Sequence, residues 1–148
     1  MTTTEPAGGF VTTAHDLHRF AEMLRRGGEL DGARVLSPAT IDYCARNHTG
    51  ERPNELWNYT VGLRGWAPFP AYIGVGFFVR GEKLTPGPFG ALNSPRTFGG
   101  FGAGSTAFWI DPAHDLTFAF LSTGLMEDSH HVERLSRLSD LVIAALVA

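Results

Sequence analysis

The chain has 148 residues, a formal net charge of −3 and 43% hydrophobic residues. This balance is that of one globular domain with its own core, and it argues against disorder. Lys83 is the only lysine and no basic stripe is present, so no nucleic-acid partner is expected, because phosphate neutralisation needs clustered cations. No apolar run reaches the ~18 residues that span a bilayer. We therefore expect no membrane partner.

The first third of the sequence predicts two helices. Thr13 suits the cap of a first helix, and Gly27–Gly28 ends it. The apolar stripe of this helix is Leu17, Phe20, Ala21 and Leu24. The Asp31–Gly32 pair predicts a small hairpin, and Ser37–Pro38 begin a shorter helix that ends near His48.

The middle of the sequence predicts two strands and a long loop. Residues 59–66 and 72–80 contain β-branched and aromatic residues, which are typical of strands. Residues 82–95 hold three prolines and little periodicity. A loop of that length in a compact domain is more often functional than idle.

Residues 96–123 predict a central hairpin. Strands over 105–110 and 116–121 are joined by a turn at Asp111–Asp115, and neither strand alternates cleanly, so both faces should be covered. Glycines crowd the start of the first strand, at Gly99, Gly100, Gly102 and Gly104. A final helix is expected over about 129–147. The element order predicts a single α+β domain over residues 1–148, with an antiparallel sheet flanked by helices.

The histidines and the cysteine do not form a recognisable metal site. His15 and His18, and the adjacent pair His130 and His131, lack acidic residues at ligand spacing, so we interpret them as solvent-facing or capping side chains. Cys44 is interpreted as a structural thiol, and as the only cysteine it forms no intrachain disulfide. No metal or cofactor is expected. The start of the sequence, MTTTEP, is not a signal peptide, and the compartment stays undetermined.

Residues 99–106, GGFGAGST, differ from a phosphate loop because no lysine precedes Ser105 and a strand follows. Two interpretations stay open. The glycines either allow tight packing of a bulged strand, or they let backbone N–H groups face a ligand oxygen. Backbone donors held in this way stabilise an oxyanion, and one donor contributes on the order of 10²- to 10³-fold in rate.

Several of these segments together resemble the C-terminal part of the serine β-lactamase-like hydrolases, which include esterases, β-lactamases and D-Ala-D-Ala peptidases. Residues 8–17, GGFVTTAHDL, resemble the family's Gly-Gly-Leu-x-Ser-Thr-Ala-x-Asp-Leu helix start, and residues 20–38 continue the likeness. Residues 98–112 resemble the strand that carries the family's third motif. The resemblance covers nearly the whole chain and implies the C-terminal portion of a β-lactamase/transpeptidase-like fold.

The resemblance also implies site residues. Counted back from Asp111–Pro112, the third motif falls on residues 100–102; its closing glycine matches, while a glycine replaces the usual Lys, His or Trp. The N–H group of Ala103 is the implied catalytic donor to the oxyanion. The implied substrate-contacting residues are Gly100, Phe101, Gly102, Gly104 and Ser105. Trp66, Phe69 and the loop over 82–95 are expected to shape an acyl pocket.

The family's nucleophile motif, Ser-x-x-Lys, and its Tyr-x-Asn motif do not occur in this sequence. In the family both lie upstream, so we expect a segment of a longer serine hydrolase, inactive alone and completed by an N-terminal fragment, that acts on a small ester or amide. One alternative is an inactive module that binds a ligand or partner through the glycine strand. Another is a structural remnant that forms a homodimer through an exposed sheet face.

Overall fold

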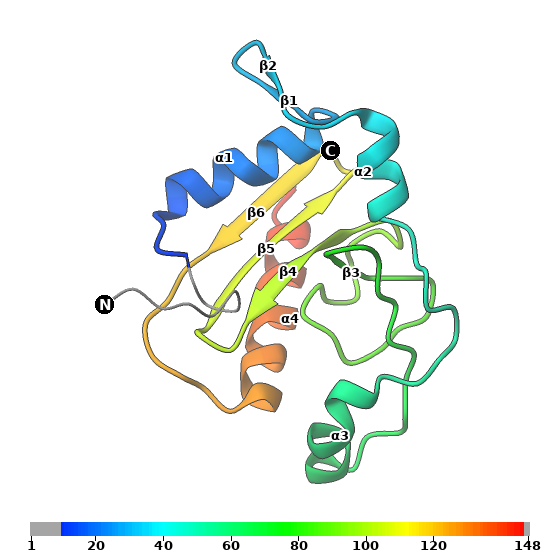
Figure 1. Ribbon diagram of the computed structural model, residues 1–148. Helices are drawn as coiled ribbons and strands as arrows, with labels where there is room; N and C mark the ends of the chain where they lie inside the picture. Colours follow the sequence, from blue (N-terminus) through cyan, green and yellow to red (C-terminus); the bar gives the residue numbers. More distant parts are fainter. Residues whose placement is uncertain (1–9, 147–148) are drawn as a thin grey trace.

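The computed structural model describes residues 10–146, and its centre is a four-stranded antiparallel sheet in the order β3-β4-β5-β6. The helices are α1 (Ala14–Arg25), α2 (Pro38–Cys44), the 3-10 helix η1 (Glu55–Trp57), α3 (Asn58–Arg64) and α4 (Asp128–Ala144). The strands are β1 (Glu29–Leu30), β2 (Ala33–Arg34), β3 (Phe78–Val79), β4 (Phe98–Gly102), β5 (Thr106–Asp111) and β6 (Leu116–Phe120). Figure 1 shows α1 and α4 on opposite faces of this sheet. The predicted α+β class is confirmed.

The first two predicted helices and the small hairpin are confirmed. The Thr13 hydroxyl accepts a hydrogen bond from the Asp16 amide at 3.1 Å, which caps α1. The Ser37 hydroxyl accepts one from the Thr40 amide at 3.0 Å, and Pro38 begins α2. The motif start at residues 8–9 and the predicted helix end at residue 147 lie outside the described residues.

The predicted strand over residues 59–66 is wrong, because α3 occupies this segment. Short apolar runs do not distinguish helix from strand, and Gly65 with φ of 63° ends a helical turn there. Of the predicted strand over 72–80, only β3 forms. Tyr72 has a φ of 46°, and Gly74 lies so close to α2 that an added Cβ would be 2.1 Å from the Cys44 carbonyl oxygen. The φ of Tyr72 interrupts an extended strand, and the backbone of Ile73 and Val75 bonds to the end of α2 and the loop after it instead of to the sheet, through His48 N–H to Ile73 O and Val75 N–H to Cys44 O, each at 2.9 Å.

The predicted hairpin exists as β5 and β6, but the glycines do not belong to its first strand. They form β4, which pairs with β5 along its whole length from Phe98–Ile110 to Gly102–Thr106. A three-residue turn over 103–105 joins the two strands. The predicted loop over 82–95 contains no helix or strand. Asp140 of α4 anchors this loop by accepting the amides of Ala91 and Leu92 at 2.7 and 2.8 Å.

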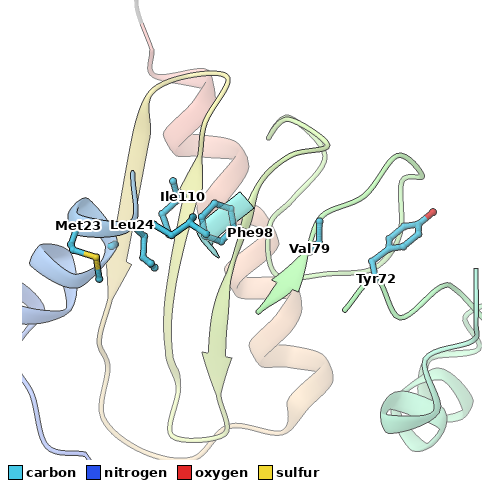
Figure 2. Packing of buried hydrophobic residues seen from close by; sticks show 8 residues of the cluster. Met23, Leu24, Tyr72, Val79, Phe98 and Ile110 are labelled. Carbon is cyan, nitrogen blue, oxygen red and sulfur yellow. The ribbon is translucent and has the colours of Figure 1, made fainter. Parts of the chain in front are cut away.

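The core has one apolar cluster on each side of the sheet region. Figure 2 shows side chains of the first cluster, in which Leu24 of α1 meets Phe98 and Ile110 of the sheet. A second cluster contains Trp57, Phe69 and Val132. None of the helices between residues 10 and 146 combines the length and apolar character needed to cross a bilayer.

Asp111 anchors the turn between β5 and β6. Its carboxylate is fully buried and accepts the Ser94 amide and hydroxyl at 2.7 and 2.6 Å, the Ala113 amide at 3.0 Å, and His114 Nδ1 at 2.8 Å. Burial by itself raises the pKa of Asp111, but these hydrogen bonds outweigh it and lower the pKa from 3.8 to about 2. The carboxyl group of Asp111 is therefore ionised in the folded protein at neutral pH.

Asp111→Asn should destabilise the protein by about 3 kcal/mol, because an amide replaces one acceptor with a donor in a buried network. Because the folded pKa is depressed, the stabilisation by ionised Asp111 is complete well above pH 3.8 and is lost as the pH falls toward 2. Urea unfolding at several pH values measures both effects. Asp115→Asn is the control: its side chain is 81% exposed, and we expect a loss below about 1 kcal/mol. Equal losses would contradict the assignment.

Gly99→Ala should cost about 2 kcal/mol or more, since an added Cβ would lie 2.1 Å from the Phe108 carbonyl oxygen and the strands would have to separate. Gly104→Ala is the matched control, because nothing lies within 4 Å of its added Cβ, and its effect should stay within about 0.5 kcal/mol. Urea midpoints of the two variants test this. If both alanines are tolerated equally, close pairing does not explain Gly99.

Candidate active site

The second half of β4 has an open edge. β3 pairs with β4 at Phe78–Gly99 and Val79–Phe98, and the Arg80 amide donates to the Thr97 carbonyl at 2.8 Å. In an antiparallel strand the backbone N–H and C=O groups of alternate residues point toward the same neighbouring strand, so those of Phe101 point toward the β3 side, like those of Gly99. Among the described pairings β3 offers Phe101 no partner. Its N–H and C=O groups are therefore open to another molecule or chain segment.

The turn after β4 presents a second open amide. The Gly102 carbonyl accepts the Ser105 amide at 3.0 Å, which closes the turn. Ala103 and Gly104 are exposed, and within residues 10–146 the Ala103 N–H donates no hydrogen bond. Ser105 is 1% exposed with φ of 65°, a conformation that this type of turn usually gives to glycine. The turn is thus buried at Ser105 and open at Ala103.

The predicted site residues lie together on β4 and this turn. The Phe101 ring packs edge-on against Trp57 at 5.6 Å between ring centroids, and lies 4.8 Å from Phe78 and 6.2 Å from His131. The aromatic wall around Phe101 is therefore built from η1, β3 and α4. A Cβ added at Gly102 would lie 3.5 Å from its nearest neighbour, the Thr106 hydroxyl, so space remains beside the main chain there. The role of Ala103 and of its neighbours stays a prediction.

A cavity of about 610 Å³ lies at the opposite end of β4, between α1, α2 and the segment before β4. Its apolar lining comprises Leu24, Ile41, Val79, Phe98 and Ile110, among other residues. None of the predicted site residues lines it. Glu82 and Pro95 of the long loop do line it, whereas Trp66 and Phe69 pack on each other elsewhere, at 6.5 Å between centroids. The residues predicted to shape an acyl pocket are therefore separated: part of the long loop lines this cavity, but Trp66 and Phe69 do not.

His131 is a residue that the sequence interpretation placed wrongly. It is 1% exposed rather than solvent-facing, and it lies beside the Phe101 ring. Burial, followed by the charge of Arg134, lowers the pKa of its imidazole. The helical spacing contained the signal, since His131 precedes Leu135 by four residues and shares its buried face. Within the described residues no three His, Cys, Asp or Glu side chains gather as a metal site.

Comparison with known proteins gives a matching family and two sequence relatives. The family model described as Beta-lactamase matches residues 1–141. The uncharacterized protein MT1414 and the protein Rv1367c, from two strains of Mycobacterium tuberculosis, are each 34% identical over 119 residues. The match covers 77% of this chain and 27% of each relative.

Solved structures agree. A crystal structure described as a β-lactamase (Mb2281c) from Mycobacterium bovis has a TM-score of 0.70 and 28% identity, covering 90% of this chain and 44% of the other. A penicillin-binding protein homologue from Caulobacter crescentus has a TM-score of 0.54 and 25% identity, covering 88% of this chain and 31% of the other. This chain spans less than half the length of each of these relatives. The chain belongs to the β-lactamase family, and its fold matches part of the chain of these structural neighbours.

Proposed function

We propose that this chain is the segment of a serine hydrolase that stabilises the oxyanion during acyl transfer from a small ester or amide. The observation that carries the proposal is the pair of main-chain N–H groups, Phe101 and Ala103, that have no sheet partner at one end of β4. The nucleophilic serine and its lysine would come from an N-terminal segment. This chain alone would then be inactive.

The chemistry of acyl transfer explains why such a strand is useful. When a nucleophile attacks a carbonyl, negative charge develops on the carbonyl oxygen, and fixed N–H donors stabilise that charge without reorganising. A donor amide must therefore be free of the sheet and held in place. Ala103 meets the first condition, and the buried Ser105 next to it in the turn meets the second.

The remaining predicted residues would contact the substrate mainly through their backbone. Gly102 and Gly104 leave room beside the main chain, so a flat acyl group could approach it there, whereas at Gly100 the Phe108 ring fills that room, 3.0 Å from where a Cβ would lie. Phe101 would add an apolar ring wall beside the open edge. Ser105 is buried, so its contribution would be to the shape of the turn.

The relatives support this proposal. The solved neighbours are described as a β-lactamase and a penicillin-binding protein homologue, and serine enzymes of both kinds carry out acyl transfer. The share of those chains that lies outside the match leaves room for a nucleophile-bearing segment. The proposal requires no cofactor.

The proposal is tested by removing one amide. In a chimaera, this chain replaces the matching part of the Mycobacterium bovis β-lactamase homologue, and turnover of nitrocefin and p-nitrophenyl butyrate is measured. Ala103→Pro deletes the N–H at a turn position that tolerates proline, so kcat should fall by on the order of 10²-fold. Ala103→Ser keeps the amide and should keep kcat.

Two results would contradict the proposal. Equal activity of the Ala103→Pro and Ala103→Ser chimaeras would remove Ala103 from the oxyanion site. Turnover by the pure chain alone, abolished by a change at one of its own serines, would show that it carries its own nucleophile. Melting temperatures of all variants are recorded so that a folding defect is recognised as such.

A further inference from the structure

Contacts from α4 and from Ser122 reach the turn over residues 102–106 on its buried side. Arg134 of α4 donates through Nη2 to His131 Nδ1 at 3.0 Å and to the Ser122 hydroxyl at 3.3 Å. That hydroxyl donates in turn to the Ser105 carbonyl at 2.9 Å. The His131 ring lies beside that of Phe101, two residues before Ala103, at 6.2 Å between ring centroids. Arg134 of α4 is therefore linked to the turn in two ways: through Ser122, and through His131.

These contacts are largely shielded from water. His131 and Ser105 are each 1% exposed. The Arg134 guanidinium carbon lies 5.1 Å from the centroid of the Phe120 ring, an arrangement typical of cation–π contacts. Burying a polar group costs free energy unless it is hydrogen-bonded. A hydrogen-bonded arrangement in this environment therefore favours one protonation state of each group over the others.

The arginine determines the histidine tautomer. A guanidinium only donates hydrogen bonds, so Nδ1 of His131 must accept, and the single proton of the neutral ring sits on Nε2. Nε2 is buried and has no hydrogen-bond partner among the described residues. The backbone of Gly102 and of Thr106 acts to raise the pKa of the ring, which places these two residues of the turn near it.

We propose that His131, fixed by Arg134 as the neutral Nε2–H tautomer, is a positioning residue that holds the Gly102–Thr106 turn, and with it the Ala103 amide, against α4. Its catalytic consequence rests on the proposed function, but the tautomer and the order of the turn do not. The chain around the turn, from Phe101 to Thr106, carries no ionisable side chain. The charges that act on His131 are Arg134 and, on the same helix, Asp128.

Protonation of His131 would disrupt this support. A proton on Nδ1 would face the Arg134 donor, and a second positive charge would lie beside the guanidinium. Burial and Arg134 lower the pKa of His131, while Asp128 only partly opposes them. The unfolded state binds the proton more tightly, so stability should fall as the pH drops below about 6.5.

Nitrogen NMR of the ¹⁵N-labelled chain at neutral pH tests the tautomer directly. We expect a pyridine-type signal for Nδ1 of His131 and a pyrrole-type signal for Nε2, with a single tautomer. Exposed His15 is the internal reference, because none of its ring nitrogens makes a hydrogen bond within the described residues; His130 does not serve, because its Nδ1 also accepts from Arg64, at 3.1 Å. A proton on Nδ1 of His131, or a mixture of tautomers, would overturn the proposal.

Amide hydrogen exchange tests the positioning role. His131→Leu should speed exchange of the Ser105 amide at least tenfold relative to amides in α1, and His131→Gln, which keeps a donor near the Nε2 position, should restore most of the protection. His130→Leu is the matched control and should change nothing at the turn. Unchanged exchange in His131→Leu overturns the proposal.

A second variant covers the case in which His131→Leu does not fold. Ser122→Ala removes the other route to the turn and should raise Ser105 exchange while α1 amides keep their protection. No rise in this variant contradicts the supporting contacts. In the chimaera, His131→Leu should lower kcat more than it raises KM. If exchange rises but kcat is unchanged, the positioning holds and the oxyanion function of the turn fails.

Discussion

The close pairing of β4 with β5 is the constraint on which the rest of the structure depends. At Gly99 the strands approach so closely that a Cβ would lie 2.1 Å from the Phe108 carbonyl oxygen and 2.7 Å from Trp109 Cα. Only a glycine-bearing strand fits this position. The pairing fixes the register down to Gly102–Thr106, and so it determines where the turn projects from the sheet.

The two ends of β4 are used differently. Phe98 lies in the core between α1 and the sheet, and it lines the cavity there. At the other end β3 no longer follows, so the main chain at Phe101 is paired on one side only. An unpaired edge is a liability in most sheets because it invites another strand. Here the aromatic side chains of Trp57 and Phe78 flank the Phe101 ring, and the open part of the edge is short.

Local signals in the sequence were sufficient for about half of the elements. The caps at Thr13 and Ser37 determine α1 and α2 through contacts within three residues, and the Asp111 turn determines the β5–β6 hairpin. The strand at β4 could not be predicted in that way, since glycines have low strand propensity and its partners are supplied by the rest of the sheet. The prediction of a strand over residues 59–66 was wrong because a short apolar run suits a helix and a strand equally.

The sequence located the candidate site but did not show which of its amides are free. The glycine run identified the right stretch of chain, because missing side chains are visible in a sequence. Which amides are free is a property of pairing, and only the register shows that the Phe101 amide faces the same side as Thr97 and Gly99 but lies beyond the residues that pair with β3. His131 was missed because histidine was interpreted by its chemistry rather than by its helical position. Its four-residue spacing to Leu135 places it in the core.

Support from α4 follows from the same geometry. A turn at the end of a sheet is free to move unless something packs under it, and a donor amide stabilises charge only when it is already in place before the charge develops. Ser105 in a left-handed conformation, Ser122 and the His131–Arg134 pair hold the turn from the side away from solvent. Because a guanidinium only donates hydrogen bonds, this arrangement requires an unprotonated Nδ1 on His131. The buried polar groups of α4 thus lie behind the turn, and the open amides of Phe101 and Ala103 lie on its other side.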